Sequence, residues 1–240
     1  MTDPGGGPGP AGDVDDRPPS APALDGDGSD RDGAGRSDDD TDDDAVDRLE
    51  AWALDVLTVL FYLPVALGSL LYLFYVGGEF ALWVRTVGEH VPRDVAAGLA
   101  VGLAVVGASY AAVPLSPIAQ RMVGALARAV GRPSWTACLV VAASSAIGEE
   151  LLFRAVLQER LGVLIATLLF ALAHFPAERD LWPWPVIAFP LGLAFAGLYA
   201  WSGAALAPIV AHAVINLLNL RLVGRWVTAS DASGATGSAR

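Results

Sequence analysis

Six residues able to do chemistry lie within otherwise apolar stretches in the second half of the chain. They are Glu149, Glu150, Arg154, His174, His212 and Asn216. Several of these stretches reach the roughly 20 residues that a helix needs to cross a bilayer. A charged side chain is costly to bury in a membrane, so each such residue is by default a functional candidate. The question is therefore which elements bring them together.

The first group predicts one ion pair and one available carboxylate. Glu150 and Arg154 are four residues apart with the acid toward the amino end, so on a helix they face each other and should pair. Glu149 is rotated by about 100° from Glu150 on a helix of 3.6 residues per turn. We therefore expect Glu150 to be structural and Glu149 to be available for chemistry.

A helical hairpin would bring His174 to the level of Glu149. The two residues are 25 positions apart, and their midpoint falls at Leu161–Gly162. If the chain turns there, each residue lies about 12 positions from the bend, or about 18 Å along its helix at 1.5 Å per residue. The spacing thus predicts a carboxylate and an imidazole facing each other within the apolar region.

The last apolar segment supplies His212 and Asn216, which are four residues apart on one face, and Asn219 continues that face. Polar groups on an apolar membrane helix must find partners inside the bundle. A carboxylate and an imidazole can together activate a water. A second His and an Asn can donate hydrogen bonds to a developing oxyanion. The combination favours hydrolysis.

The sequence resembles the CPBP (Abi) family of intramembrane endopeptidases, which includes type II CAAX prenyl endopeptidases and bacteriocin-processing or immunity proteins. The resemblance rests on Glu149-Glu150-x-x-x-Arg154, Phe170-x-x-x-His174 and His212-x-x-x-Asn216, which occur in the family's order. It covers about residues 134–222, and residues 1–133 contribute little. It implies that Glu149 and His174 activate the hydrolytic water and that His212 and Asn216 form the oxyanion site. Glu150 and Arg154 would then support the site or engage substrate.

The same resemblance favours a metal-free glutamate mechanism, so we expect no cofactor. Glu149, His174 and His212 would also suit Zn²⁺ by ligand type, and Zn²⁺ stays open as the alternative. The expected partners are the lipid bilayer and a peptide or lipid-modified protein substrate, with no nucleic acid. Prenylation of the substrate is one possibility among several.

The composition separates an acidic tail from a membrane-embedded remainder. The chain has 240 residues, 54% hydrophobic, and a net charge of −11, but residues 1–50 carry 16 acidic residues and 4 Arg, which leaves +1 for the rest. Such long apolar runs exclude a simple soluble enzyme. We expect a disordered Asp/Gly/Pro-rich tail (1–47), amino-terminal transmembrane helices with an amphipathic linker (48–133), a catalytic core (134–224) and a flexible tail (225–240).

The apolar segments predict an all-α, polytopic membrane bundle of about six to seven transmembrane helices in the cell membrane. The segments are 52–76, 94–114, 134–157, 161–175, 185–201 and 205–222. Ile118 to Arg132 carries Arg among apolar residues, as in a helix lying on a membrane surface. With six spans, eight Arg fall on the amino-terminal side and four opposite, which favours cytoplasmic termini.

Three other interpretations compete with the peptidase. The polar residues could form a structural network that holds the bundle together. They could form the proton relay of a proton-coupled carrier, although the sequence shows no internal repeat of the kind found in many transporters. The chain could also be a non-catalytic immunity or scaffold protein. Cleavage of a substrate separates the peptidase from the carrier and from the non-catalytic protein.

Overall fold

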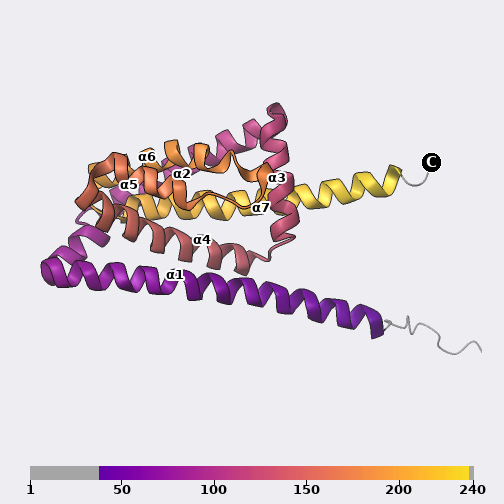
Figure 1. The fold of residues 1–240 in the computed structure, drawn as a ribbon, viewed down its shortest axis with the longest axis horizontal. Helices are drawn as coiled ribbons and strands as arrows, with labels where there is room; N and C mark the ends of the chain where they lie inside the picture. The colour runs from indigo at the N-terminus through magenta and orange to yellow at the C-terminus, as the bar shows by residue number, and fades with distance from the viewer. Residues whose placement is uncertain (1–37, 238–240) are drawn as a thin grey trace, which may run out of the picture. The chain divides into compact units, whose positions relative to one another are not determined.

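The computed structural model describes the backbone of residues 38–237 and the side chains of residues 55–225, and the described part contains helices and no strand. The all-α prediction is confirmed. In chain order the helices are α1 (Asp38–Thr86), α2 (Val91–Leu115), α3 (Pro117–Val130), α4 (Trp135–Glu150), the π-helix η1 (Leu151–Gln158), α5 (Glu159–Ala173), the 3₁₀ helix η2 (Arg179–Leu181), α6 (Trp184–Ser202) and α7 (Leu206–Gly237) (Figure 1).

Five helical stretches of the described chain are long and apolar enough to cross a membrane. They are Asp55–Thr86, Val91–Leu115, Trp135–Ala173, Arg179–Ser202 and Leu206–Arg225. This number is lower than the predicted six to seven because Trp135–Ala173, at 39 residues, combines two of the predicted segments. The protein is a multi-pass membrane protein, as predicted.

The third stretch is a hairpin, and it turns at the predicted position. Gly162 has φ 81° and ψ 166°, a conformation that glycine alone adopts readily. The rings of Phe153 and Phe170 lie 5.3 Å apart between centroids, whereas 17 positions along a straight helix would separate them by about 25 Å. The chain therefore folds back at Gly162. The returning arm, residues 163–173, is only about 16 Å long.

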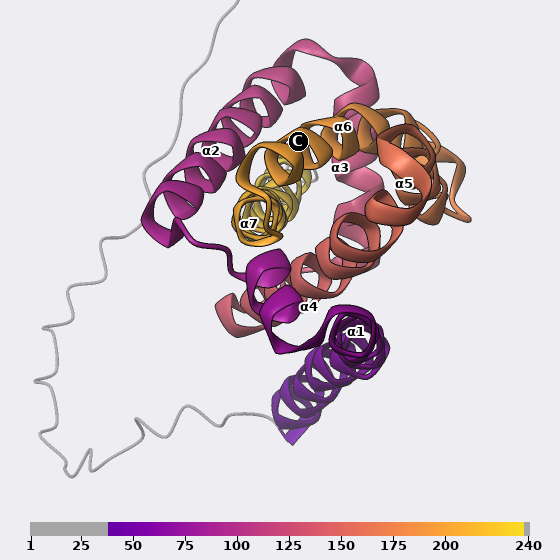
Figure 2. The same cartoon turned by 90° about the vertical axis from the view of Figure 1, so that its left-hand side faces the viewer.

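Helix α7 lies among α2, α4 and α6 (Figure 2). Two glycines on α2 allow the closest of these contacts. A Cβ on Gly98 would lie 2.5 Å from the carbonyl oxygen of Ala207, and one on Gly102 would lie 3.0 Å from that of Ala211. Small residues let membrane helices approach closely enough for their backbones to touch. The α2–α7 contact thus fixes the helix that carries His212.

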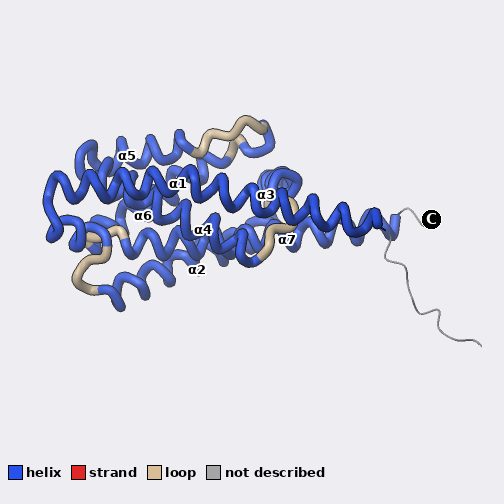
Figure 3. The backbone as a smooth tube through the Cα atoms, turned by 90° about the horizontal axis from the view of Figure 1, so that it is seen from below, coloured by secondary structure: helices blue, strands red, loops and turns tan. Residues whose placement is uncertain are grey.

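Helix α3 runs across the end of the bundle, beside α2 and α7 (Figure 1). Its Arg128 forms ion pairs with Glu178 and Asp180 of the segment before α6, at 3.1 and 3.4 Å. A helix therefore covers the region where the sequence predicts an amphipathic surface helix, and its place on a membrane surface stays a prediction. The connections between helices lie at the ends of the bundle, as the tube in Figure 3 shows.

Both terminal helices extend into segments for which the sequence predicts tails. The backbone is helical from Asp38 onward and continues in α7 to Gly237. Extending an existing helix needs no new nucleation, which is the costly step. The rest of the predicted tails, residues 1–37 and 238–240, lies outside the described residues.

Replacing Gly98 should destabilise the protein, and a matched glycine on the same helix provides the control. The Gly98→Ala Cβ would overlap α7, and overpacking costs about 1–3 kcal/mol. Gly107→Ala meets no atom within 4 Å, so we expect a neutral or slightly stabilising effect. Thermal unfolding in detergent should show a lower midpoint for Gly98→Ala only. Equal midpoints for the two variants would contradict the close α2–α7 packing.

Candidate active site

Glu149 lies at the centre of the candidate site, between two histidines from other parts of the bundle. Its Oε2 atom is 3.6 Å from Nε2 of His174 and 4.0 Å from Nε2 of His212. The three residues come from α4, from the end of α5 and from α7, and the hairpin at Gly162 brings the first two to the same level. The three side chains are between 5% and 19% exposed. The structure therefore brings together the carboxylate and imidazoles that the sequence singled out.

His174 presents Nε2 to Glu149 because its other ring nitrogen is engaged. Nδ1 lies 2.7 Å from the carbonyl oxygen of Phe170, one turn earlier. A carbonyl can only accept, so Nδ1–H is the donor and the neutral tautomer leaves Nε2 unprotonated. The Phe170 ring also packs on the imidazole, with centroids 4.5 Å apart. The ring is thus held with its basic nitrogen toward Glu149.

Glu150 forms the predicted ion pair and one further contact. Its Oε2 accepts a hydrogen bond from Nε of Arg154 at 2.9 Å, and both side chains are fully buried. Its Oε1 lies 2.7 Å from Nδ1 of His212. The guanidinium of Arg154 also lies over the Phe170 ring, 4.9 Å from the centroid. Both oxygens of this carboxylate are therefore paired, and the carboxylate connects the hairpin to α7.

Two aromatic rings hold His212 in place. Phe195 of α6 stacks on its imidazole at 5.1 Å with an interplanar angle of 16°, and Phe170 meets it edge-on at 6.1 Å. With Nδ1 held by Glu150, Nε2 is the nitrogen directed to Glu149. The link between Glu150 and His212 joins residues 62 positions apart, and no local spacing could have predicted it.

Asn216 and Asn219 have separate partners. The Asn216 amide donates to Oγ of Ser145 at 3.0 Å, and Ser145 lies one helical turn before Glu149. One N–H of the Asn216 amide remains for another acceptor. Asn219, by contrast, donates to Oγ of Ser109 on α2 at 3.4 Å and so helps to hold α7 against α2. Ser145 could have been found from the sequence because it is four residues from Glu149 on one face.

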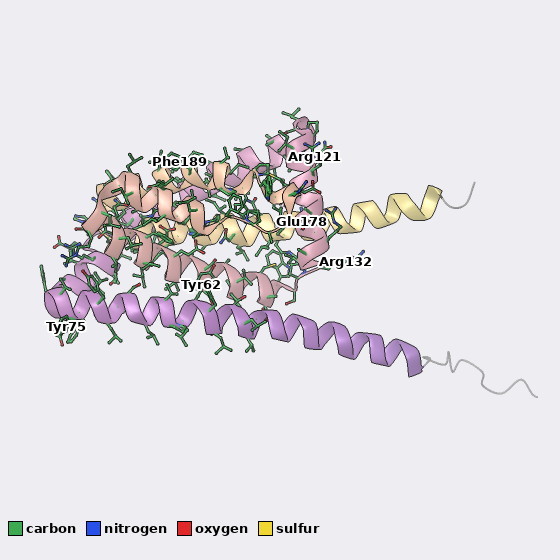
Figure 4. All side chains as sticks on the ribbon, viewed as in Figure 1. Tyr62, Tyr75, Arg121, Arg132, Glu178 and Phe189 are labelled. Atoms are coloured by element: carbon green, nitrogen blue, oxygen red, sulfur yellow. The ribbon has the colours of Figure 1, made fainter. Side chains whose placement is uncertain are left out.

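Tyr62 of α1 contacts Glu149, and the sequence did not predict this contact. Its hydroxyl donates to Oε1 of Glu149 at 2.6 Å. The approach depends on Gly148, where a Cβ would lie 2.9 Å from Cδ1 of Tyr62. Figure 4 shows Tyr62 on the side of α1 that faces α4. A tyrosine in an apolar span carries no signal of its own in one sequence, since aromatic residues are common in membrane helices.

The six residues that the sequence singled out fall within one segment that resembles a known family. They are Glu149, Glu150, Arg154, His174, His212 and Asn216. Residues 131–218 match the family model described as type II CAAX prenyl endopeptidase Rce1-like. The resemblance predicted from the three motifs is confirmed, and it places the segment among membrane-embedded proteins.

A relative from Bacillus subtilis (strain 168), the uncharacterized protein YpbD, is 40% identical to the chain over 77 residues. The alignment covers 30% of this chain and 37% of that protein. No solved structure gives a significant match to the chain.

The donor atoms do not form a ready metal site. Across the described residues, no group of three or more His, Cys, Asp or Glu side chains is placed to hold a metal ion. Glu149, His174 and His212 have the right chemistry for Zn²⁺, and the facing atoms, 3.6 and 4.0 Å apart, are slightly wider than the ligands of one tetrahedral ion. The described residues therefore offer side chains, and not a preformed metal site, for the chemistry of the site.

Breaking the buried ion pair should destabilise the protein more than removing both charges. Arg154→Met leaves Glu150 charged and fully buried without its guanidinium partner, which costs about 3–5 kcal/mol. In the double variant Glu150→Gln/Arg154→Met the uncompensated charge is gone, so unfolding in detergent should occur at a higher temperature than for Arg154→Met. The control is Arg85→Met, whose pair with Glu159 is more than a third exposed and worth about 0–1 kcal/mol. Equal losses for Arg154→Met and Arg85→Met would contradict the buried pair.

Proposed function

We propose that this protein is an intramembrane endopeptidase that hydrolyses peptide bonds of membrane-associated substrates. The family match supports a CAAX-type intramembrane protease at the level of the family. The observation that carries the proposal is the position of Oε2 of Glu149, which faces two imidazole nitrogens and is buried without a hydrogen-bond donor among the described residues. A carboxylate oxygen held in this way can take a proton from water.

In this proposal Glu149 is the general base and His174 orients the water. A water within hydrogen-bond reach of Oε2 of Glu149 can donate one proton to it and the other to Nε2 of His174, which is the unprotonated ring nitrogen. Glu149 takes its proton as the water oxygen attacks the carbonyl carbon of the substrate. Such positioned acid–base groups typically accelerate hydrolysis by about 10²–10⁴-fold.

His212 and Asn216 are the proposed oxyanion donors. The second N–H of the Asn216 amide can reach a developing oxyanion while the first stays on Ser145. His212 pairs through Nδ1 with Glu150, so it can donate from Nε2 as an imidazolium. Donors of this kind act where charge develops in the transition state.

The formal charges of the site favour the same assignment. With His212 as imidazolium and both glutamates ionised, Glu149, Glu150, Arg154 and His212 sum to zero. A balanced, hydrogen-bonded set is the least costly way to bury four ionisable groups in a membrane. Glu150 and Arg154 then support the site by holding His212.

The tetrahedral intermediate collapses when the carbon–nitrogen bond breaks, and the proton held by Glu149 passes to the leaving nitrogen. The products are an amine and a carboxylic acid, and the acid then gives its proton to the amine or to water and becomes a carboxylate. Because the site lies within the apolar part of the helices, the proposed substrate is a peptide or lipid-modified protein that is already in the membrane. No cofactor takes part in these steps.

Replacing the proposed base should abolish cleavage while leaving the fold intact. Glu149→Gln keeps the shape of the side chain and removes the base, so we expect kcat to fall by about 10²–10⁴-fold, and His174→Ala to cause a similar loss. Asn216→Ala should lower kcat by about 10²–10³-fold. The measurement is mass spectrometry of membrane-protein termini in cells with the wild type or Glu149→Gln, followed by kinetics on a peptide that the comparison identifies.

The control for these variants is thermal unfolding in detergent, which should stay close to that of the wild type. If folded Glu149→Gln and His174→Ala proteins both cleaved at the wild-type rate, the proposed mechanism would be wrong. Proton-driven solute uptake into proteoliposomes, lost in the same variants, would instead favour a carrier.

Removing metal ions should leave cleavage unchanged. The proposed steps use only side chains and water, so activity should survive EDTA or phenanthroline at concentrations that strip Zn²⁺ from a zinc peptidase assayed in parallel. Activity that disappears with the chelator and returns with added Zn²⁺ would replace this mechanism by the alternative in which Glu149, His174 and His212 bind the metal.

A further inference from the structure

The two oxygens of Glu149 have different surroundings. Oε1 accepts the hydroxyl of Tyr62 at 2.6 Å, while Oε2 faces His174 and His212 and has no donor among the described residues. The end of a glutamate side chain rotates easily because its last torsion is broad. Something must therefore fix the rotation of the carboxylate so that one oxygen faces the histidines, and Tyr62 is the donor that holds the other oxygen.

The position of Tyr62 on α1 supports a specific contact. Its chain neighbours Phe61 and Leu63 are 65% and 49% exposed, so they point away from the bundle, whereas Tyr62 is partly buried against α4. Gly148, the residue before Glu149, meets both the ring and the backbone of Tyr62: a Cβ there would lie 2.9 Å from Cδ1 and 3.3 Å from the carbonyl oxygen. The helices thus touch at the point where the hydroxyl reaches the carboxylate.

We propose that Tyr62 is a positioning residue for Glu149, holding Oε1 so that Oε2 faces the water and the two histidines. This inference rests on the proposed function and adds a residue to it. Tyr62 lies outside the segment 131–218 that matches the family model, so α1 supplies part of the site from a region that the family comparison does not cover. A hydrogen bond to a charged group is short and strong, and a misplacement of about 1 Å in a reacting group can cost about 100-fold in rate.

The test begins with Tyr62→Phe, which removes the hydroxyl and keeps the ring against Gly148. We expect kcat to fall by about 10-fold with KM unchanged, because Glu149 is misaligned and substrate contacts are not touched. The substrate is a membrane peptide whose new terminus appears in wild-type cells and is absent with Glu149→Gln. Tyr75→Phe is the matched control: Tyr75 lies on the same helix, is 90% exposed, and its substitution should leave kcat unchanged.

A second variant reaches the same contact from the other helix. The Cβ of Gly148→Ala would displace Tyr62 from Glu149, so kcat should again fall by about 10-fold. If both substitutions act through one hydrogen bond, the double variant should be no slower than Gly148→Ala alone. If kcat of the double variant fell by the product of the two single losses, the substitutions would act independently, and the inference would be overturned.

The outcomes separate this inference from the proposed function. Wild-type kcat for Tyr62→Phe, with Glu149→Gln inactive, would overturn the role of Tyr62 and leave the mechanism standing. A loss shared equally by Tyr62→Phe and Tyr75→Phe, or a rise in KM with kcat unchanged, would also overturn it. Wild-type activity of Glu149→Gln would overturn the proposed function itself.

Discussion

A carboxylate buried in an apolar bundle must have its charge compensated, and the way Glu150 meets this requirement organises the rest of the site. One of its oxygens accepts from Arg154 on the next helical turn and the other contacts His212 on α7. Each partner is then held by an aromatic ring, Arg154 by Phe170 and His212 by Phe195. A single buried ion therefore connects the hairpin, α6 and α7. Removing either partner would leave one oxygen of that buried ion unpaired, which is costlier than losing an exposed pair.

Glu149, the adjacent residue, has a hydrogen-bond donor for only one of its two carboxylate oxygens. Tyr62 donates to one of its oxygens, and the other faces two histidines without a hydrogen bond from the described residues. The 100° between successive helical residues accounts for the difference, because it directs Glu150 into the packed core and Glu149 toward α1 and the histidines. Two chemically identical neighbours thus have different surroundings, and the less satisfied one is the better candidate for proton transfer.

Local spacing predicted those parts of the site that depend on helical geometry. The Glu150–Arg154 pair follows from an i,i+4 rule, and the meeting of Glu149 with His174 follows from their nearly equal distances to Gly162. Contacts between distant segments could not be predicted from local spacing. Tyr62 is 87 positions from Glu149, and a tyrosine in an apolar helix resembles any lipid-facing aromatic residue. The direction of Asn219 toward Ser109 was missed for the same reason, since a shared face does not say which neighbour each turn meets.

The hairpin also explains why one arm is too short to cross a membrane. Residues 163–173 extend about 16 Å at 1.5 Å per residue, roughly half of a 30 Å hydrocarbon core. The arm ends where His174 meets Glu149, so its length sets the depth of the candidate site. The turn at Gly162 needs a positive φ, and the residues on both arms pair about that point, as Phe153 and Phe170 do. The depth of the candidate site in the bundle is therefore set by the position of Gly162 between Glu149 and His174 along the chain.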